Sequence, residues 1–339
     1  MKSDQPASKA SEWKNTIINI KKSSMLSFIA IVLFILILPR FGFQYASYLM
    51  LTFFGYGVAV LGWNLLFGYT GLLSFGHALF FAVGAYTLAF LMNKFSIFHM
   101  EAILVITVII SGALAALVGA ICVRYTRVYF GMLTLAFNML FYSFLLKFYY
   151  ITGGDEGMNV SRPYLLGVDF LGIPKMQFLT GSYYYYAWAV LVIATLIMYG
   201  VVSSPFGHCL KAIRDNPEKA TYLGIDIKRY RWYAFIISGI YTAVGGVLVA
   251  PVVGLVDPSM AYWTHSGTLV FMALLGGFVN FLGPLLGSVL YIFLQDTIMS
   301  LLYYWRFVFG AMLAFIVIAA PGGIAGFIGS LMNKEETGV

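Results

Sequence analysis

Long apolar runs, separated by short polar connectors, recur along most of this sequence and constrain its fold more than any single motif. Most runs reach the roughly 20 residues that an α-helix needs to cross the hydrocarbon core of a bilayer. Charged residues make up only 10% of the chain, whereas a typical soluble domain contains about 25%. The sequence therefore predicts an all-α, polytopic membrane helix bundle and excludes a soluble globular domain.

We expect about ten transmembrane helices, some of them interrupted, with eight or nine as the alternatives. The predicted spans lie at residues 25–38, 45–67, 72–91, 102–123, 128–149, 183–202 and 232–253, at two places within 264–302, and at 307–328. The stretch 264–302 is too long for one helix, so we divide it between Gly276 and Gly283. A membrane domain at residues 25–328 is thus expected between polar tails at residues 1–24 and 329–339.

The first apolar run follows a lysine-rich tail and is similar in outline to a signal peptide. No small-residue cleavage site follows it, so we expect an uncleaved first helix with its N-terminus in the cytoplasm. Counting spans from there places Arg124 and Arg127 in the cytoplasm, in agreement with the positive-inside bias. The longest opposite connector, residues 150–182, is not enriched in positive charge, and the C-terminal tail returns to the cytoplasm.

One long charged passage, residues 203–230, lies between strongly apolar segments and must therefore lie in water on one side of the membrane. Its apolar positions are spaced for a short helix, a turn marked by Pro217, and a second helix. Gly224 is placed to end the second helix, since glycine readily adopts the left-handed conformation of a C-terminal cap. We predict a cytoplasmic helical hairpin that hangs from two membrane spans.

Several separated blocks carry a resemblance to a known family. The run from Gly207 to Gly224 resembles the cytoplasmic coupling segment of ATP-binding-cassette (ABC) importer permeases, in particular the LivM/LivH-type permeases of branched-chain amino acid uptake. The other blocks are GYTGLLSFGHALFFAVGAY at 68–86, YFGMLTLAFNML at 129–140, ITGGDEGMN at 151–159 and SGTLVFMALLGGFVNFLGPLLGS at 266–288. They occur in the family's order, and the resemblance covers most of the chain from about Gly55 onward.

The resemblance implies a non-enzymatic transport subunit of the bacterial inner membrane, which moves branched-chain or related amino acids by alternating access. Its implied partners are a homologous second permease or a copy of itself, two ABC ATPase subunits and a periplasmic solute-binding protein, with membrane lipid around the spans. We expect no cofactor on this chain. ATP and Mg²⁺ would bind the separate ATPases, because the sequence contains no G-x-x-x-x-G-K-[ST] motif. The net charge of +7 comes from cytoplasmic connectors and does not indicate nucleic acid.

Under this resemblance the helical hairpin docks on an ATPase subunit. The apolar face expected to enter a groove of the ATPase carries Leu210, Ile213, Ala220, Leu223 and Ile225. Gly224 ends this pair of helices. The polar rim, which sets register, carries Lys211, Arg214, Asp215 and Glu218. The alternative is an ordinary solvated connector whose basic charge only fixes topology.

The translocation path is expected along the small-residue stretch 68–86 and the span 128–149. The sequence GYTG before Leu72 suits an interrupted helix, and unwound backbone beside a cavity supplies polar contacts to solutes in transporters. The residues expected on the path are Gly71, Ser74, His77, Thr134 and Asn138. The alternatives are close helix packing for the glycine and interhelical hydrogen bonds for the polar side chains.

The outer connector is dense in Gly, Pro, Asp and Asn, as is typical of turns and loops. By the resemblance it faces the periplasm, where a binding protein docks. Asp155, Glu156 and Arg162 are expected as rim contacts for that protein. A plain surface loop is the alternative.

Two other classes of transporter stay open. Asp296 lies in a predicted span, and an intramembrane carboxylate suggests a proton relay in an ion-coupled secondary transporter. No second buried carboxylate accompanies it in the sequence pattern. The other class is a passive channel for a small neutral solute such as urea. Scattered histidines, and two cysteines without metal-ligand spacing, give no support for an enzyme or a metal site.

Overall fold

The computed structural model describes residues 38–41, 44–125, 127–170, 172–319, 323 and 326. The chain divides into two compact units, Met1–Ser47 and Tyr48–Val339. In the first unit the described residues form a short 3₁₀ turn, η1 (Leu38–Phe41), and the start of α2 (Gln44–Thr70). The first predicted helix and both predicted tails lie almost entirely outside the described residues. All other elements belong to the second unit.

The second unit is helical along most of its described length. After α2, the α-helices are α3 (His77–Phe95), α4 (Met100–Cys122), α5 (Arg127–Lys147), α6 (Tyr149–Thr152), α7 (Lys175–Phe178), α8 (Tyr184–Ser203), α9 (Pro205–Asp215), α10 (Pro217–Tyr222), α11 (Ile227–Val253), α12 (Trp263–Gly276), α13 (Gly283–Leu301) and α14 (Trp305–Ala319). The remaining elements are the 3₁₀ turns η2 (Gly154–Glu156) and η4 (Pro258–Ala261), the π-helical turn η3 (Leu179–Tyr183), and the strands β1 (Met158–Asn159) and β2 (Leu255–Val256).

Seven helices in the described part of the chain are long and apolar enough to cross a membrane: α2, α3, α4, α5, α11, α13 and the stretch Lys175–Ser203, which contains α7 and α8. The predicted membrane helix bundle is therefore confirmed. The predicted division of 264–302 is also confirmed, because α12 ends at Gly276 and α13 begins at Gly283.

Two elements differ from the predicted spans. The 14 residues of α12 extend only about 21 Å, which is less than the roughly 30 Å of a hydrocarbon core, so α12 is too short for the full crossing predicted for it. The third predicted span begins at residue 72, but α3 begins at His77. Residues 71–76 are not helical, because α2 ends at Thr70 and Gly71 follows with a positive φ.

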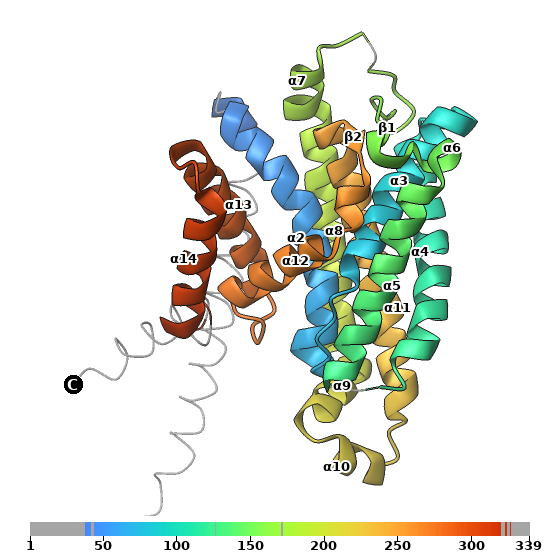
Figure 1. Cartoon of the computed structure of the whole chain (residues 1–339), viewed down its shortest axis with the longest axis vertical. Coiled ribbons are helices and arrows are strands. Elements are labelled where there is room, and N and C mark those ends of the chain that lie inside the picture. The colour runs from blue at the N-terminus through green and yellow to red at the C-terminus, as the bar shows by residue number, and fades with distance from the viewer. Residues whose placement is uncertain are drawn as a thin grey trace, which may run out of the picture. The chain divides into compact units, whose positions relative to one another are not determined.

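Helix α3 is buried along most of its length and packs mainly against α11 and α4 (Figure 1). Glycines permit the closest approach. A Cβ atom at Gly84 would lie 1.9 Å from the carbonyl oxygen of Ala243, and one at Gly246 would lie 2.0 Å from that of Phe81. Small residues let membrane helices come this close, so van der Waals contact between backbones stabilises the pair.

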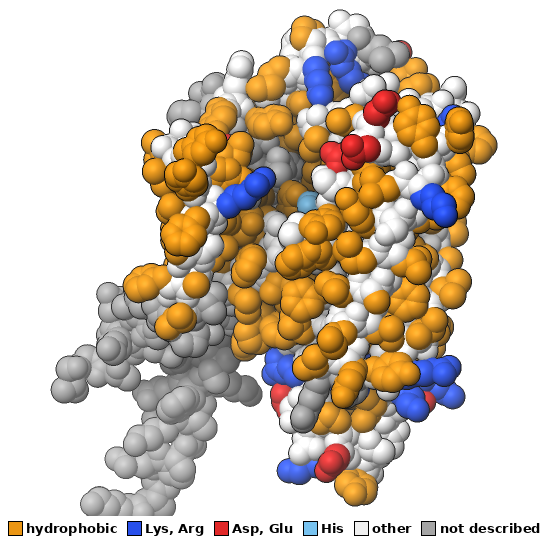
Figure 2. All heavy atoms as spheres, viewed as in Figure 1, with side chains coloured by type: hydrophobic (Ala, Val, Ile, Leu, Met, Phe, Trp, Pro, Cys, Tyr) orange, Lys and Arg blue, Asp and Glu red, His pale blue; other side chains and the backbone are white. Residues whose placement is uncertain are grey.

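The outward faces of α4 and α5 are apolar. The exposed residues Val105, Ile109 and Leu117 lie on α4, and Met132 and Leu140 lie on α5. In Figure 2 hydrophobic side chains cover the middle of the visible face, whereas most charged side chains gather toward its two ends. An apolar band between two polar ends is the arrangement that a bilayer requires of a protein crossing it.

The two polar ends carry different structures (Figure 1). The hairpin end carries α9 and α10, and the loop end carries α7 and the two short strands. Strand β1 pairs with β2 in antiparallel register, with Met158 opposite Val256 and Asn159 opposite Leu255. This pairing ties the connector after α5 to the connector after α11.

Candidate coupling and translocation site

The break between α2 and α3 lies close to the hairpin end. Gly71 has a φ of +74°, which glycine adopts without the steric cost that a side chain brings. Its N–H donates to Phe67 O at 3.0 Å, and the N–H of Leu72 donates to Leu66 O at 3.2 Å. This pattern ends α2 and begins the non-helical segment 71–76.

Polar groups of the break bond to neighbouring helices. Trp63 Nε1 donates to Ser74 O at 3.0 Å, and Phe75 N donates to Thr134 Oγ1 at 3.3 Å. A Cβ atom at Gly76 would lie 2.7 Å from Thr134 O, so the segment passes directly against α5. Irregular backbone is tolerated inside a membrane protein where protein groups satisfy it, as they do here.

His77 joins the start of α3 to the break and to α11. Its side chain is fully buried, with Nδ1 at 3.0 Å from Ser74 Oγ and Nε2 at 2.6 Å from Ser238 Oγ on α11. The next residue is held from α12, where Ser266 Oγ accepts a hydrogen bond from Ala78 N at 2.8 Å. The sequence did not indicate Ser238 and Ser266 as partners, since an isolated serine in an apolar span gives no sign of which helix it faces.

On α5 the two predicted path residues share one buried face, as their spacing predicts. Thr134 Oγ1 donates to Gly131 O at 2.9 Å, and Asn138 Nδ2 donates to Ala261 O at 2.9 Å. Asn138 Oδ1 is buried and has no hydrogen-bond partner within the part of the chain that is described. A buried amide oxygen without a partner is costly, which makes this atom the most weakly satisfied polar group on the face.

The predicted path residues therefore lie in contact regions between helices. Ser74, His77, Thr134 and Asn138 are each at most 1% exposed, whereas Gly71 is exposed. Hydrogen bonds between elements, the alternative that the sequence left open, are present at His77, Thr134 and Asn138. Their part in translocation stays a prediction, because it depends on how the helices separate.

The helical hairpin has the predicted form. α9 ends at Asp215, Pro217 begins α10, and the side chain of Asn216 caps α10 by accepting from Lys219 N at 3.0 Å. Gly224 follows α10 with a φ of +81°, the conformation expected of a residue that terminates a helix. Local sequence signals were sufficient to predict this element.

The hairpin holds the C-terminal end of α2 through two cations. Arg214 Nη1 donates to Gly68 O, and Lys211 Nζ lies 5.3 Å from the centroid of the Tyr69 ring. A Cβ atom at Gly71 would lie 3.1 Å from Arg214 Cγ, so the arginine stem lies against the break itself. Positive charge at the C-terminus of a helix is favourable, because the last carbonyl groups carry partial negative charge.

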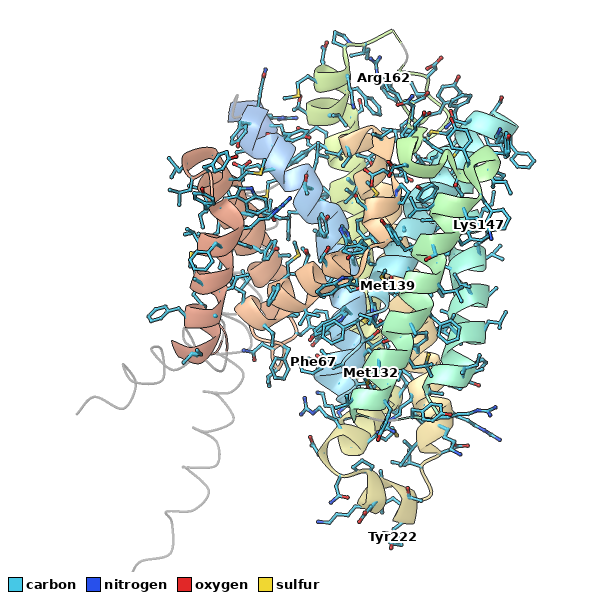
Figure 3. All side chains as sticks on the ribbon, viewed as in Figure 1. Phe67, Met132, Met139, Lys147, Arg162 and Tyr222 are labelled. Carbon is cyan, nitrogen blue, oxygen red and sulfur yellow. The ribbon has the colours of Figure 1, made fainter. Side chains whose placement is uncertain are left out.

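The predicted docking face of the hairpin needs a correction. Leu210, Ile213 and Ala220 are at most 1% exposed, and Leu210 belongs to the hydrophobic core of the membrane domain. These side chains attach the hairpin to its own chain and are not presented outward. The exposed apolar residues are Leu223, at 78%, and Tyr222, at 89%, which points away from the bundle at the tip (Figure 3).

The polar residues predicted on the rim differ in exposure. Asp215, Glu218 and Lys211 are exposed. Arg214 is only 30% exposed and forms an ion pair with Asp215, with 3.2 Å between Nε and Oδ1. The outward surface of the hairpin is thus a small apolar tip beside mixed charges.

At the loop end the outer connector is ordered by bonds to other elements. Asn93 Nδ2 donates to Asn159 O at 2.8 Å, and Glu101 Oε1 accepts from Leu166 N at 2.8 Å. Among the predicted docking residues, Asp155 is exposed and Glu156 Oε2 accepts from Tyr149 Oη at 3.0 Å. That hydrogen bond raises the pKa of the Tyr149 hydroxyl.

The third predicted docking residue, Arg162, points inward to the loop. Its Nη1 atom donates to Phe170 O at 3.4 Å and to Ile173 O. Asp296 is half-buried near the C-terminal end of α13 and has an interaction partner. The proton-relay alternative for this carboxylate stays a prediction.

The membrane-crossing helices, the broken α2–α3 junction and the polar helical hairpin define a multi-pass membrane protein. Residues 45–317 match the family described as the permease component of branched-chain amino acid transport systems. The chain belongs to this family.

Named relatives agree with this family. The chain is 26% identical over 286 residues to the high-affinity branched-chain amino acid transport permease LivM of Salmonella typhimurium. The aligned region covers 79% of this chain and 67% of the relative. It is 27% identical to the probable LivM of Methanocaldococcus jannaschii, over 74% of this chain and 80% of the relative. It is also 23% identical to the galactose import permease MglC of Haemophilus influenzae, over 64% and 66%. No solved structure matches the chain.

Proposed function

We propose that this chain is a transmembrane subunit of an ABC importer in a bacterial inner membrane, with both termini in the cytoplasm. Its solute would be a branched-chain or related amino acid, delivered by a periplasmic binding protein. ATP hydrolysis would take place on two separate ATPase subunits. Similarity to LivM permeases supports the solute class, and the contact between the hairpin and the α2–α3 break supports the mechanism.

The hairpin would receive the movement of the ATPase. Its exposed tip, Tyr222 and Leu223, is apolar, and the nearby charges of Asp215 and Glu218 face water. An apolar anchor surrounded by polar residues is the usual composition of a protein interface, in which the rim charges set specificity. The buried residues Leu210, Ile213 and Ala220 then serve to make the hairpin rigid against its own chain.

The hairpin would transmit this movement through the α2–α3 break. Arg214 bonds to the end of α2, and residues 71–76 bond in turn to α5. A displacement of the hairpin would therefore move residues 71–76, the non-helical segment between α2 and α3. His77 extends the connection to α11 through Ser238.

The same junction would open the path for the solute. When the helices are in contact, His77 Nε2 is within hydrogen-bond distance of Ser238 Oγ on α11, and Thr134 Oγ1 accepts from Phe75 N in the break. Asn138 Nδ2 donates to Ala261 O. Separation of these helices would leave the groups unsatisfied unless water or a polar solute replaced the lost partners. Such residues favour an open state that is hydrated and a closed state that is dry.

The remaining partners follow from the same proposal. A second permease, either homologous or a copy of this chain, would complete the translocation path. A binding protein would dock at the loop end, where Asp155 is exposed beside Glu156. The ordered loop there gives such a partner a defined surface.

Co-purification with the ATPase tests this function. The Leu223→Glu variant alters only an exposed tip residue and should lose ATPase recovery from membranes by about tenfold, because a charge placed in an apolar contact is costly. Leu166→Glu is the matched control, since Leu166 is 80% exposed and lies at the loop end. Equal recovery of the ATPase with both variants would contradict docking at the tip. If the ATPase is recovered neither with the variants nor with the native chain, a secondary transporter or a channel is favoured.

A further inference from the structure

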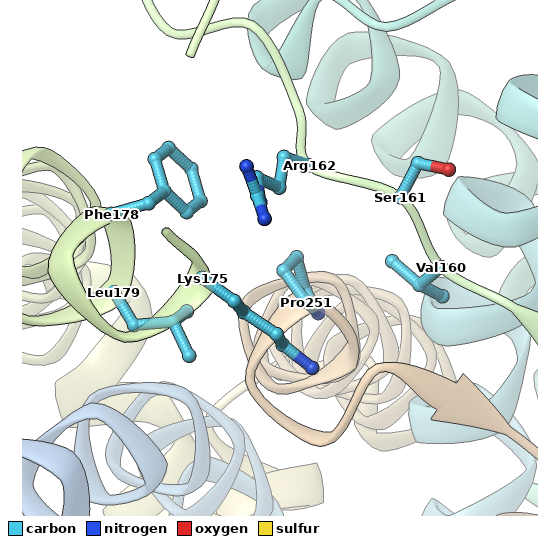
Figure 4. Close-up of a pocket in the computed structure, with 7 residues that line it drawn as sticks. All are labelled: Val160, Ser161, Arg162, Lys175, Phe178, Leu179 and Pro251. Atoms are coloured by element: carbon cyan, nitrogen blue, oxygen red, sulfur yellow. The ribbon is translucent and has the colours of Figure 1, made fainter. Parts of the chain in front are cut away.

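A pocket of about 330 Å³ lies at the loop end, between the outer connector and the C-terminal end of α11. Its apolar walls are Phe178 at the end of α7, Leu179, Val160 and Pro251 (Figure 4). The volume falls in the range of small-ligand sites, which begins at about 300 Å³. No step of the proposed coupling mechanism uses this pocket.

Two cations line the pocket. Arg162 and Lys175 reach it from different segments of the outer connector, and Figure 4 shows both side chains beside the apolar wall. None of the described residues that line it is acidic. A site with two positive charges, no acid and apolar walls selects an anion that carries an apolar group.

The structure holds each cation in place. The guanidinium group of Arg162 bonds to carbonyl oxygens of residues 170 and 173, which orients its plane. Lys175 Nζ lies over the end of α11, where Gly254 has a φ of +85° and a Cβ atom would lie 2.4 Å from Nζ. The missing side chain makes room for the ammonium, and the helix carbonyls favour positive charge there.

We propose that this pocket is a carboxylate subsite, in which a carboxylate lies between Lys175 and Arg162 and an adjacent aliphatic group contacts Phe178 and Leu179. The ligand class is a small aliphatic carboxylate. That the ligand is the transported solute on its way in rests on the proposed function. Because no acid lines the pocket to pair with an α-ammonium group, the carboxylate is the group that the pocket recognises.

Three related ligands test the chemistry. L-leucine, 4-methylpentanoate and 3-methylbutylamine share one branched chain and differ in their charged groups. We expect saturable binding of 4-methylpentanoate to the purified full-length protein in lipid nanodiscs, equal or weaker binding of leucine, and no binding of the amine. Isothermal titration measures all three. Binding of the amine as strong as that of 4-methylpentanoate would overturn the proposal.

Lys175→Gln is the variant of choice, because Arg162 also supports the fold of the loop. It should weaken 4-methylpentanoate binding at least about tenfold, as expected for loss of one charge-assisted hydrogen bond. Lys175→Arg should retain binding. Lys147→Gln is the matched control, since Lys147 is an exposed cation at the end of α5 and is outside the pocket (Figure 3). Equal weakening in the control would refute the site.

A second arm separates two sources of carboxylate. If free 4-methylpentanoate does not bind the native protein, the small-solute site is refuted. If Lys175→Gln then weakens the affinity for the periplasmic binding protein, the two cations serve a carboxylate side chain of that protein. ATPase recovery with the native hairpin is measured separately, so failure of the pocket and failure of the proposed function are distinguishable.

Discussion

Replacing Arg214 with glutamine should uncouple ATP hydrolysis from transport while leaving the ATPase bound. Arg214 is the residue of the hairpin that both hydrogen bonds to the end of α2 and lies against the break at Gly71. Its side chain is only 30% exposed, so water replaces the lost contact incompletely. Glutamine keeps a polar group but loses the positive charge and cannot reach Gly68 in the same way.

The size of the effect follows from the lost interactions. A hydrogen bond from a charged donor contributes about 1.5–3 kcal/mol, and a cation at a helix C-terminus adds about 0.3–1 kcal/mol. We take the lower end, because Arg214 also pairs with Asp215, which is 67% exposed. A weakening of about 1.5 kcal/mol, the lower end of the hydrogen-bond contribution alone, corresponds to roughly a tenfold change in the fraction of hairpin movements that carry the break along.

The assay is solute uptake per ATP hydrolysed, measured in proteoliposomes that contain the permease and its ATPase. We expect Arg214→Gln to lower this ratio about tenfold at unchanged ATPase recovery, and Arg214→Lys to give an intermediate ratio, since lysine keeps the charge but not the planar fork. Arg229→Gln is the control, because Arg229 also forms an ion pair, with Asp226, but its side chain is 79% exposed. A ratio for Arg214→Gln equal to that of the control would refute the coupling argument.

Three further predictions concern the membrane domain. Gly84→Leu should lower the yield and melting temperature of the detergent-purified protein, because a Cβ atom would lie 1.9 Å from Ala243 O, whereas Gly200→Leu should not, since nothing lies within 4 Å of a Cβ atom there. His77→Ala should abolish uptake and destabilise the protein by about 1–3 kcal/mol, because Ser238 Oγ loses its 2.6 Å partner; unchanged uptake and thermal unfolding would contradict the role of His77 as a junction. Asp296→Asn should retain ATP-driven uptake, and loss of uptake in this variant at normal expression would support an ion-coupled transporter.

The main membrane helices and the hairpin could be predicted from sequence because their signals are local. A run of about 20 apolar residues specifies a span wherever it occurs, since lipid leaves no alternative for its backbone. Pro217 and Gly224 mark the start and end of α10 by backbone geometry alone. The end of α12 at Gly276 was predicted, but its count as a full span was wrong, because its 14 residues are fewer than the roughly 20 that a crossing needs.

The covered face of the hairpin could not be predicted in the same way. The positions of Leu210, Ile213 and Ala220 show an apolar face, but the same pattern suits contact with an ATPase or with the chain's own helices. The structure places these residues inward and leaves Leu223 outward. Amphipathic spacing determines that a face is covered and leaves open what covers it.

The sequence by itself determined a multi-pass helical membrane protein, a break before α3 and a polar hairpin, because hydrophobic length, charge and helix-ending residues act over a few turns of chain. Only the tertiary structure decided which polar groups meet. Arg214 bonds to a residue 146 positions earlier, and His77 bonds to a residue 161 positions later. Such pairs depend on how distant helices pack around one another, and each buried polar atom takes the partner that this packing brings within reach.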